Sequence, residues 1–417
     1  MSTIDDILRR ARDAQRALAR LPRAARDAAL DAVSASLSAR RDAVLAANAA
    51  DVEAATALST AMRDRLTLTP ARFDAMLAAL AEVRAMPDPL DAERFVQERP
   101  NGLRVYKRRV PLGVIAVVYE ARPNVTVEAA SLTLRSGNAA VLRGGSEAIR
   151  SNAALAEAVR EGLARAGLPV DAVTLVTDLD RARVAELMGA VGKVDLLIPR
   201  GGDALMAFVD AHAKVPVVRH GQGVCHVYVD AAADAEMASA IALNAKVSRP
   251  GVCNAMETLL VHREAAERVL PALGRRFAEA GVELRAGPEA IELLRAAGVP
   301  AKHAVEGDWD TEFLGLTLAV RLVGGLDEAL AHIAEHGTGH TASVVTADAE
   351  VGERFLREVE ASCVLWNAST RFNDGGQLGL GAEIGISTTR MHAWGPMSAA
   401  ELTAEKFVVR GDGQVRV

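Results

Sequence analysis

Hydrophobic positions recur every three to four residues from the start of the chain to Pro87, as in Ala29-Leu30-Val33-Leu37. This spacing predicts an antiparallel run of amphipathic helices, which Pro87 and Pro89 bring to an end. Two strand-like segments follow at 93–98 and 103–110, and the turn residues between them predict a β-hairpin.

From Val110 the pattern changes to short apolar runs that alternate with longer helical stretches. The predicted elements are, in order, strand 114–119, helix 127–134, strand 139–142, helix 146–166, strand 173–176, helix 181–188 and strand 196–198. Ser146 is the expected N-cap of the long helix, and Gly167 stands just past its end. Alternation of this kind predicts an α/β doubly wound domain with a parallel sheet between two layers of helices.

A second alternation begins near Val227. Its predicted elements are helix 234–246, strand 257–261, helix 265–280 and strands 317–323 and 342–345. We expect a second, smaller α/β domain, with the boundary near Val229.

Composition and charge exclude several classes of protein. Half of the residues are apolar and 24% are charged, which is typical of a folded chain. A net charge of −6 and 3% aromatic residues argue against nucleic-acid binding. The purest apolar stretch, 113–119, is too short to span a membrane, and no signal peptide is apparent. The three cysteines are too few and too scattered for a disulfide framework, so we expect a cytoplasmic protein.

Two glycine-rich corners follow predicted strands, although the chain lacks both the Gly-x-Gly-x-x-Gly fingerprint and a phosphate-loop Gly-Lys-Ser/Thr. One corner is Arg143-Gly144-Gly145-Ser146, and the other is Arg200-Gly201-Gly202-Asp203. Backbone N–H groups at a helix start, the Ser146 hydroxyl and the Arg143 guanidinium together suit a phosphate group. Ordinary strand–turn–helix packing would also explain both corners.

Cys253 lies in a loop that contains Pro250 and Gly251, between a predicted helix and a predicted strand. A thiol there would be partly exposed, and Lys246 and Arg249 nearby would favour its thiolate. The sequence therefore allows either a nucleophile or an unreactive loop cysteine. Cys225 and Cys363 adjoin apolar strand residues, where buried packing is expected.

Three histidines stand four residues apart at 332, 336 and 340, which raises the possibility of a metal site. Glycines at 337 and 339 break the helix before the third histidine, and the motif lacks a glutamate in the zinc-protease order. We therefore expect no metal centre.

Several longer motifs occur together in one order along the chain. They are residues 119–126, 142–148, the segment around Cys253, 332–341 and 369–375. Together they resemble the gamma-glutamyl phosphate reductase family, which belongs to the aldehyde dehydrogenase superfamily. Two positions depart from that pattern, because Ala342 stands where an acidic residue is usual and Trp394 where an arginine is usual.

The resemblance implies a reaction and the residues that carry it out. Cys253 would attack L-glutamyl 5-phosphate to form a thioester, which NADPH would reduce to the semialdehyde, the second step of proline synthesis from glutamate. Asn124 and the Cys253 N–H would hold the oxyanion. The implied cofactor residues are Arg143, Gly145, Ser146, Gly201, Gly202 and Glu312. Arg122 and Arg371 would bind the anionic groups of the substrate.

The resemblance also implies an organisation of the chain and its partners. Residues 1–98 and 111–229 would form the NADPH-binding domain and 230–390 the catalytic domain, with 99–110 and 391–417 serving oligomerisation. A homo-oligomer is expected, and glutamate 5-kinase is a candidate partner.

Four alternatives stay open at this point. The first is a hydrolytic aldehyde dehydrogenase, which would need a water-activating glutamate where this chain has His220, a candidate base. The second is a reductase of another acyl phosphate. The third is a metal hydrolase that uses the three histidines, and the fourth is a non-catalytic protein that keeps the fold.

Overall fold

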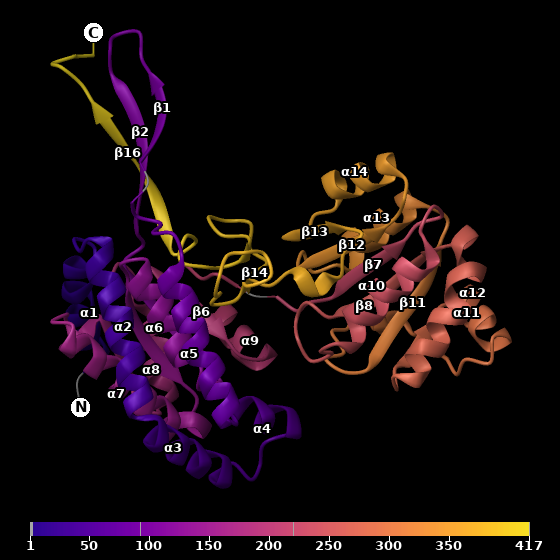
Figure 1. The fold of residues 1–417 in the computed structure, drawn as a ribbon, viewed down its shortest axis with the longest axis horizontal. Coiled ribbons are helices and arrows are strands. Elements are labelled where there is room, and N and C mark those ends of the chain that lie inside the picture. Colours follow the sequence, from indigo (N-terminus) through magenta and orange to yellow (C-terminus); the bar gives the residue numbers. More distant parts are fainter. Residues whose placement is uncertain (1–2, 92, 220, 417) are drawn as a thin grey trace.

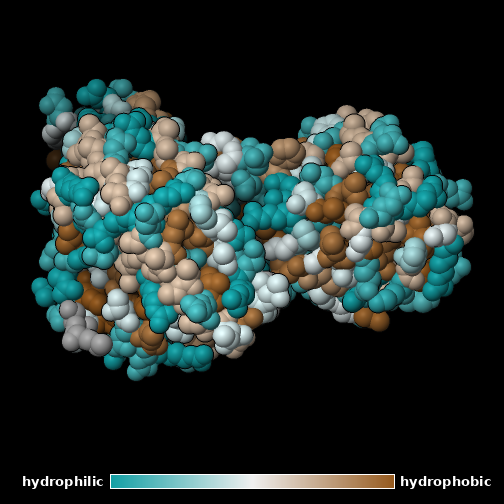
Figure 2. Space-filling view, turned by 60° about the horizontal axis from the view of Figure 1, so that its bottom comes forward, coloured by the Kyte–Doolittle hydropathy of each residue, from teal (hydrophilic) through white to brown (hydrophobic). Residues whose placement is uncertain are grey.

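The computed structural model describes residues 3–91, 93–219 and 221–416. Two lobes are joined by a thin connection, and a long hairpin projects from the first lobe (Figure 1). The space-filling view shows a narrower waist between the lobes and a largely hydrophilic outer surface (Figure 2). No helix in the described ranges is long and apolar enough to cross a membrane.

The amphipathic segments at the start of the chain are helical, as their spacing predicts. They are α1 (Ile4–Leu18), α2 (Arg23–Ala39), α3 (Arg41–Ala54), α4 (Thr60–Leu66) and α5 (Pro70–Ala85). The apolar stripe of α2 is completely buried, and α2 packs on α5 and α7 (Ile149–Arg165). Helices α2 and α5 cover one face of the first sheet, whereas Ile4, Ile7, Leu8 and Ala11 of α1 pack on its other face.

The first sheet is parallel and has four strands in the order β5-β4-β3-β6. Its strands are β3 (Val114–Tyr119), β4 (Ala139–Gly144), β5 (Val173–Leu175) and β6 (Leu196–Arg200), and the further helices of this lobe are α6 (Val125–Arg135), α8 (Arg181–Gly189) and α9 (Asp203–His212). Every residue of β3 and β4 is buried, as continuous apolar runs predict. Apolar clusters lie on both faces of the sheet, so the doubly wound fold is confirmed.

The second sheet is also parallel and has seven strands in the order β10-β9-β11-β8-β7-β12-β13. Its strands are β7 (Cys225–Val229), β8 (Met256–His262), β9 (Glu283–Ala286), β10 (Lys302–His303), β11 (Thr317–Val323), β12 (Thr341–Val345) and β13 (Cys363–Trp366). Its helices are α10 (Ala235–Val247), α11 (Arg263–Glu279), α12 (Pro288–Ala296), α13 (Leu326–His336) and α14 (Ala349–Glu358). Two apolar clusters again cover its two faces.

A third, antiparallel sheet forms the projecting hairpin seen in Figure 1. It consists of β1 (Glu93–Glu98), β2 (Arg104–Pro111) and β16 (Thr403–Arg410), in which β16 pairs with β2 along its whole length. Phe95 and Phe407 are exposed on this sheet. A short antiparallel pair of strands, β14 (Ile386–Ser387) and β15 (Gly395–Pro396), lies in the segment between the two lobes (Figure 1).

Three expectations differ from the structure. Ser146 does not cap a long helix, because a 3-10 turn at Ser146–Ala148 comes first and α7 begins at Ile149 without a side-chain cap. Strand β7 pairs with β8 and β12, so the boundary between the two sheets lies before Cys225 rather than near Val229. Ala393, Met397, Ala399 and Leu402 pack into the first lobe's core, so part of the predicted oligomerisation segment 391–417 belongs to that lobe.

Candidate active site

The predicted site residues come from opposite edges of the two sheets. In the first sheet they follow β3, β4 and β6, at the carboxyl edge of parallel strands. In the second sheet Cys253 precedes β8 and Glu312 precedes β11, at the amino edge. Strands β3 and β6 are neighbours in this sheet. From β3 the chain adds β4 and then β5 on one side, and it then returns to add β6 on the other side of β3. Ligands of open α/β sheets bind at such a switch point.

The Cys253 loop lies between α10 and β8, tightly packed on the backbone around it. A Cβ atom on Gly223 would lie 1.8 Å from the Cys253 carbonyl oxygen, so this approach requires glycine. The Cys225 thiol donates to the same oxygen at 3.1 Å. Thr370 donates its hydroxyl proton to the Asn254 carbonyl oxygen at 2.7 Å. The loop is therefore held from two sides while Cys253 itself stays partly exposed.

Opposing charges act on the Cys253 thiol. Burial raises its pKa, and the carboxylates of Glu383 and Glu312 add to that rise. Arg200 and, more weakly, Arg122 lower it by favouring the thiolate. Both of these cations belong to the first lobe.

The prediction that Lys246 stabilises the Cys253 thiolate is wrong. Its Nζ atom is completely buried and lies 2.5 Å from Oε2 of Glu257, which is also completely buried. Burial lowers the pKa of Lys246 and raises that of Glu257 to about 7. The ammonium charge is therefore balanced locally by its own carboxylate.

Arg122 and Arg200, by contrast, form no ion pair in the part of the chain that the structure describes. Burial, together with the positive charges of Arg200 and Arg65, lowers the pKa of Arg122 to about 10. The guanidinium groups of Arg122 and Arg200 therefore share a common region close to the thiol. Glu128 also faces it, since both Arg122 and Arg200 lower the pKa of this buried carboxyl, which burial raises.

The other predicted substrate and catalytic residues lie around the same region. Asn124 is exposed at the start of α6, and its Nδ2 donates to Oε2 of Glu128 at 3.4 Å. Arg371 donates from Nε to the Ser248 hydroxyl at 3.3 Å, and its charge interacts with Cys253. The structure therefore brings Asn124, Arg122, Arg371 and Glu312 to the Cys253 loop.

In the first glycine corner, the predicted phosphate ligand Arg143 is hydrogen-bonded to backbone carbonyl groups. The buried guanidinium donates to the carbonyl oxygens of Gly144 and Leu179 at 2.9 and 2.8 Å, so it ties the loop together. Ser146 is exposed beside it. Glu147 turns its carboxylate back to accept the Ala121 N–H at 2.6 Å.

The second glycine corner follows β6. The Gly202 N–H, at the start of α9, donates to Oε2 of Glu120 at 3.0 Å. A Cβ atom on Gly201 would lie 2.5 Å from the same oxygen. Glu120 therefore holds this corner against the end of β3, and one predicted phosphate donor is already engaged.

The three histidines do not share one site. The rings of His332 and His336 are 4.5 Å apart, whereas His340 lies against Thr341 at 2.6 Å. His226 packs edge-on against His332. The described residues hold no group of three or more His, Cys, Asp or Glu side chains that could bind a metal ion. His220, the candidate base, lies outside the described residues.

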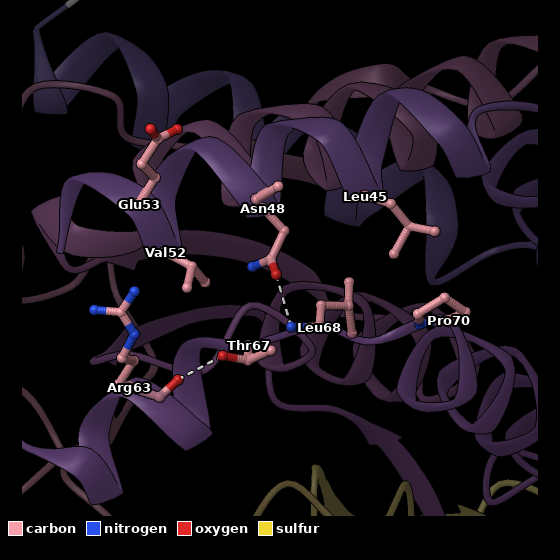
Figure 3. A pocket seen from close by; sticks show the side chains of 9 residues that line it. Leu45, Asn48, Val52, Glu53, Arg63, Thr67, Leu68 and Pro70 are labelled. Atoms are coloured by element: carbon pink, nitrogen blue, oxygen red, sulfur yellow. Dashed lines mark hydrogen bonds between the residues drawn. The ribbon is translucent and has the colours of Figure 1, made fainter.

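A cavity of about 490 Å³ lies between α3, α4 and α5 (Figure 3). Apolar side chains such as Leu45, Val52 and Leu68 line much of it, and Oδ1 of Asn48 accepts a hydrogen bond from the Leu68 N–H at 2.7 Å. None of the predicted site residues lines this cavity.

Sequence reasoning missed three charged residues at the site, Arg200, Glu128 and Glu383. Arg200 directly precedes the second glycine corner, so its place at a strand end was visible in the sequence. Glu383 carried no such signal, because its position depends on how the segment after β13 returns to the first lobe. Burial raises its pKa to about 7, and its Oε2 accepts the Gly375 N–H at 2.8 Å.

Comparison with known proteins identifies the family. The model of the aldehyde dehydrogenase family matches residues 1–290. Gamma-glutamyl phosphate reductase of Anaeromyxobacter sp. is 55% identical over 97% of this chain and 95% of its own length. The enzyme of the same name from Nitratidesulfovibrio vulgaris is 52% identical over 100% of this chain and 99% of its own.

Solved structures agree with the sequence comparison. The crystal structure of gamma-glutamyl phosphate reductase from Thermotoga maritima is 40% identical and covers all of both chains, with a TM-score of 0.95. An acetylating aldehyde dehydrogenase from Geobacillus thermoglucosidasius, 18% identical over 99% of this chain and 97% of its own, has a TM-score of 0.69 and shares the fold. This chain belongs to the gamma-glutamyl phosphate reductase family, within the aldehyde dehydrogenases, and is an oxidoreductase.

Proposed function

We propose that this enzyme reduces L-glutamyl 5-phosphate to L-glutamate 5-semialdehyde and phosphate with NADPH, the second step of proline biosynthesis, through a thioester on Cys253. The name shared by its relatives supports the reaction. The observation that carries the mechanism is a partly exposed thiol within the field of two arginines that have no carboxylate partner among the described residues.

Cys253 acts as the nucleophile. Its thiolate attacks C5 of the acyl phosphate, a C–S bond forms, and the C–O bond to phosphate breaks with its electron pair on the leaving oxygen. Phosphate is a good leaving group, so this step needs little acid catalysis. NADPH, when bound, supplies the hydride that reduces the thioester, and collapse of the thiohemiacetal returns the thiolate.

Two donors suit the oxyanion that forms on C5. The Asn124 side chain is exposed at the start of α6. The Cys253 N–H has no acceptor within the described residues. Hydrogen-bond donors fixed around a developing oxyanion contribute a few kcal/mol to the transition state.

The residues at the first sheet's carboxyl edge fit a dinucleotide phosphate. Gly201 is partly exposed beside a topological switch point, and Ser146, which follows the buried Gly145, is exposed. NADPH is favoured over NADH because Glu147 is turned away toward Ala121, which leaves no carboxylate of this turn to repel a 2′-phosphate. Arg181 adds positive charge close by, since it lowers the pKa of the buried Arg143. Glu312 would hold the nicotinamide ribose.

Arg122 and Arg371 bind the anionic groups of the substrate, since a guanidinium matches carboxylate and phosphate geometry. The enzyme works in the cytoplasm as a homo-oligomer, for which the hairpin sheet offers exposed Phe95 and Phe407. Glutamate 5-kinase, which would supply the unstable acyl phosphate, is its proposed partner.

One observation favours the hydrolytic alternative. A carboxylate with a pKa near 7 next to a thioester can activate water, and Glu383 has a pKa of about 7 and acts on Cys253. Against it, the segment that packs on Cys253 through Gly223 carries no glutamate. A phosphate requirement in the reverse reaction separates the two activities.

The test follows NADP⁺ reduction by glutamate semialdehyde with and without inorganic phosphate. Strict dependence on phosphate supports acyl-phosphate chemistry. Turnover that is independent of phosphate would mean that water cleaves the thioester, and the hydrolytic activity would then replace the proposed one.

A further inference from the structure

Arg200 is the last residue of β6, at the switch point of the first sheet. Its carbonyl oxygen accepts the Glu120 N–H at 3.0 Å, which fixes its backbone against the end of β3. Gly385 lies directly against its guanidinium, because a Cβ atom there would be 2.8 Å from Nη1. Gly385 also has a φ of +142°, so glycine is required on both counts.

The guanidinium of Arg200 has no counter-ion among the described side chains. Its Nε is buried without a hydrogen-bond partner, and none of the carboxylate side chains that the structure describes lies within ion-pair distance of it. A buried donor that is left without a partner costs free energy. An unpaired cation in such a place points to an anionic ligand.

Arg200 also stands at the centre of the charged groups of the site. The positive charge of Arg200 lowers the pKa values of Cys253, Glu128 and Glu383, and it also lowers the pKa of Arg122 by repulsion. Among the cations that act on Cys253, Arg200 has the larger effect and Arg122 the smaller. Arg200 therefore favours the Cys253 thiolate more strongly than Arg122 does.

We propose that Arg200 is a catalytic residue that binds the phosphate group, both as it leaves glutamyl phosphate and as it attacks the thioester in reverse. The inference rests on the proposed function and deepens it. The phosphate group is attached to C5, the carbon that Cys253 attacks, whereas the α-carboxylate lies at the far end of the substrate. The cation with the larger effect on the sulfur accordingly suits the phosphate, and Arg122 suits the carboxylate.

The step balances without another reactant. In the reverse direction an oxygen of HPO₄²⁻ forms a bond to C5, the C–S bond breaks with its electrons on sulfur, and the phosphate proton passes to solvent. The products are the acyl phosphate and the Cys253 thiolate. Arg200 stabilises the dianion before attack and the thiolate after it.

The experiment compares wild type, Arg200→Gln, Arg200→Lys and Arg84→Gln in NADP⁺ reduction by glutamate semialdehyde at varied phosphate. Arg84 is the matched control, since it is an exposed arginine paired with Asp31. We expect Arg200→Gln to raise the KM for phosphate roughly ten- to hundredfold, because a charge-assisted hydrogen bond is lost. Arg200→Lys should give a smaller rise, and Arg84→Gln none.

A second readout does not depend on turnover. Inorganic phosphate should slow alkylation of Cys253 by iodoacetamide in wild type and in Arg200→Lys, but not in Arg200→Gln. The alkylation profile of Arg200→Gln should also shift to higher pH, because the cation that favours the thiolate is gone. Thermal melting of each variant shows whether it is folded.

The outcomes separate the two claims. If wild type requires phosphate while Arg200→Gln keeps its KM for phosphate within twofold and its phosphate protection, the role of Arg200 is overturned and the proposed function stands. If wild type turns over equally well without phosphate, the proposed function and the role of Arg200 both fail.

Discussion

The Cys253 loop lies beside two kinds of cation. In the second lobe Lys246 is completely buried and its ammonium is neutralised by Glu257 at 2.5 Å. In the first lobe Arg122 and Arg200 lie at a sheet edge with no carboxylate partner among the described residues. Both arrangements adjoin the Cys253 loop, and the charges of Arg200 and Arg122 lower the pKa of the thiol.

This difference separates structure from function. A buried pair is complete in itself, and removal of either partner leaves an uncompensated charge. A cation without a partner is stable only where water or a ligand supplies the opposite charge. We infer that the second lobe provides the nucleophile on a fixed framework, while the first lobe provides the charge that binds the substrate's anions.

The largest expected effect comes from the nucleophile itself. Cys253→Ala should abolish turnover, because no thioester can form. NADPH binding, measured by fluorescence titration, should stay within a fewfold of wild type. Substantial residual turnover would show that Cys253 is not the nucleophile.

Lys246 and Glu257 should contribute to the free energy of unfolding as a pair rather than independently. Lys246→Met and Glu257→Gln should each lower the free energy of unfolding in urea by about 3–5 kcal/mol, because each leaves one buried charge alone. The double variant Lys246→Met/Glu257→Met should recover most of that loss. Single variants that cost less than about 1 kcal/mol would mean that the pair is not a buried ion pair.

The second lobe also keeps a buried histidine neutral. Burial lowers the pKa of His226 to about 4, from an ordinary value of 6.5. Between these values the unfolded chain binds a proton that the folded chain does not, so stability falls as the pH falls from 6.5 toward 4. From pH 7.5 to pH 5 this residue should cost about 2 kcal/mol.

Urea unfolding of His226→Leu at those two pH values tests this account. The variant should lose about 2 kcal/mol less than wild type over the same range. His332, whose pKa is also lowered by burial, keeps part of the pH dependence in both proteins. An identical pH dependence in wild type and variant would show that His226 does not stay neutral.

The smallest effect is expected for a paired cation on the surface. Arg84→Gln should change the free energy of unfolding by less than about 1 kcal/mol and leave turnover unchanged, because exposed ion pairs contribute little. A loss of several kcal/mol in urea unfolding would contradict the distinction between exposed and buried pairs.

Much of the fold was predictable because its signals are local. The apolar runs at 114–119 and 139–142 predicted buried strands, and the spacing in α2 predicted a helix with one buried face. The position of β7 was not predictable in this way. Its sequence is apolar like the strands of the first sheet, and its assignment depends on pairing with β12, more than a hundred residues away.

The site residues likewise divide into those with a local signal in the sequence and those whose role depends on distant contacts. Cys253, Asn124 and Arg122 belong to motifs that the sequence displays, and the structure brings them to one region. Lys246 and Arg143 were misjudged because sequence shows a charge but not its partners. Lys246 is neutralised by Glu257, and Arg143 donates to two backbone carbonyls. Glu383 reaches the site only through the return of the chain to the first lobe.

The most direct test of this account is to trap the thioester. The enzyme is mixed with NADP⁺ and glutamate semialdehyde without phosphate, quenched in acid and examined by intact and peptide mass spectrometry. We predict a glutamyl adduct on Cys253 that persists until phosphate is added and then disappears. An adduct that water removes equally fast, or one that forms on another residue, would contradict the account.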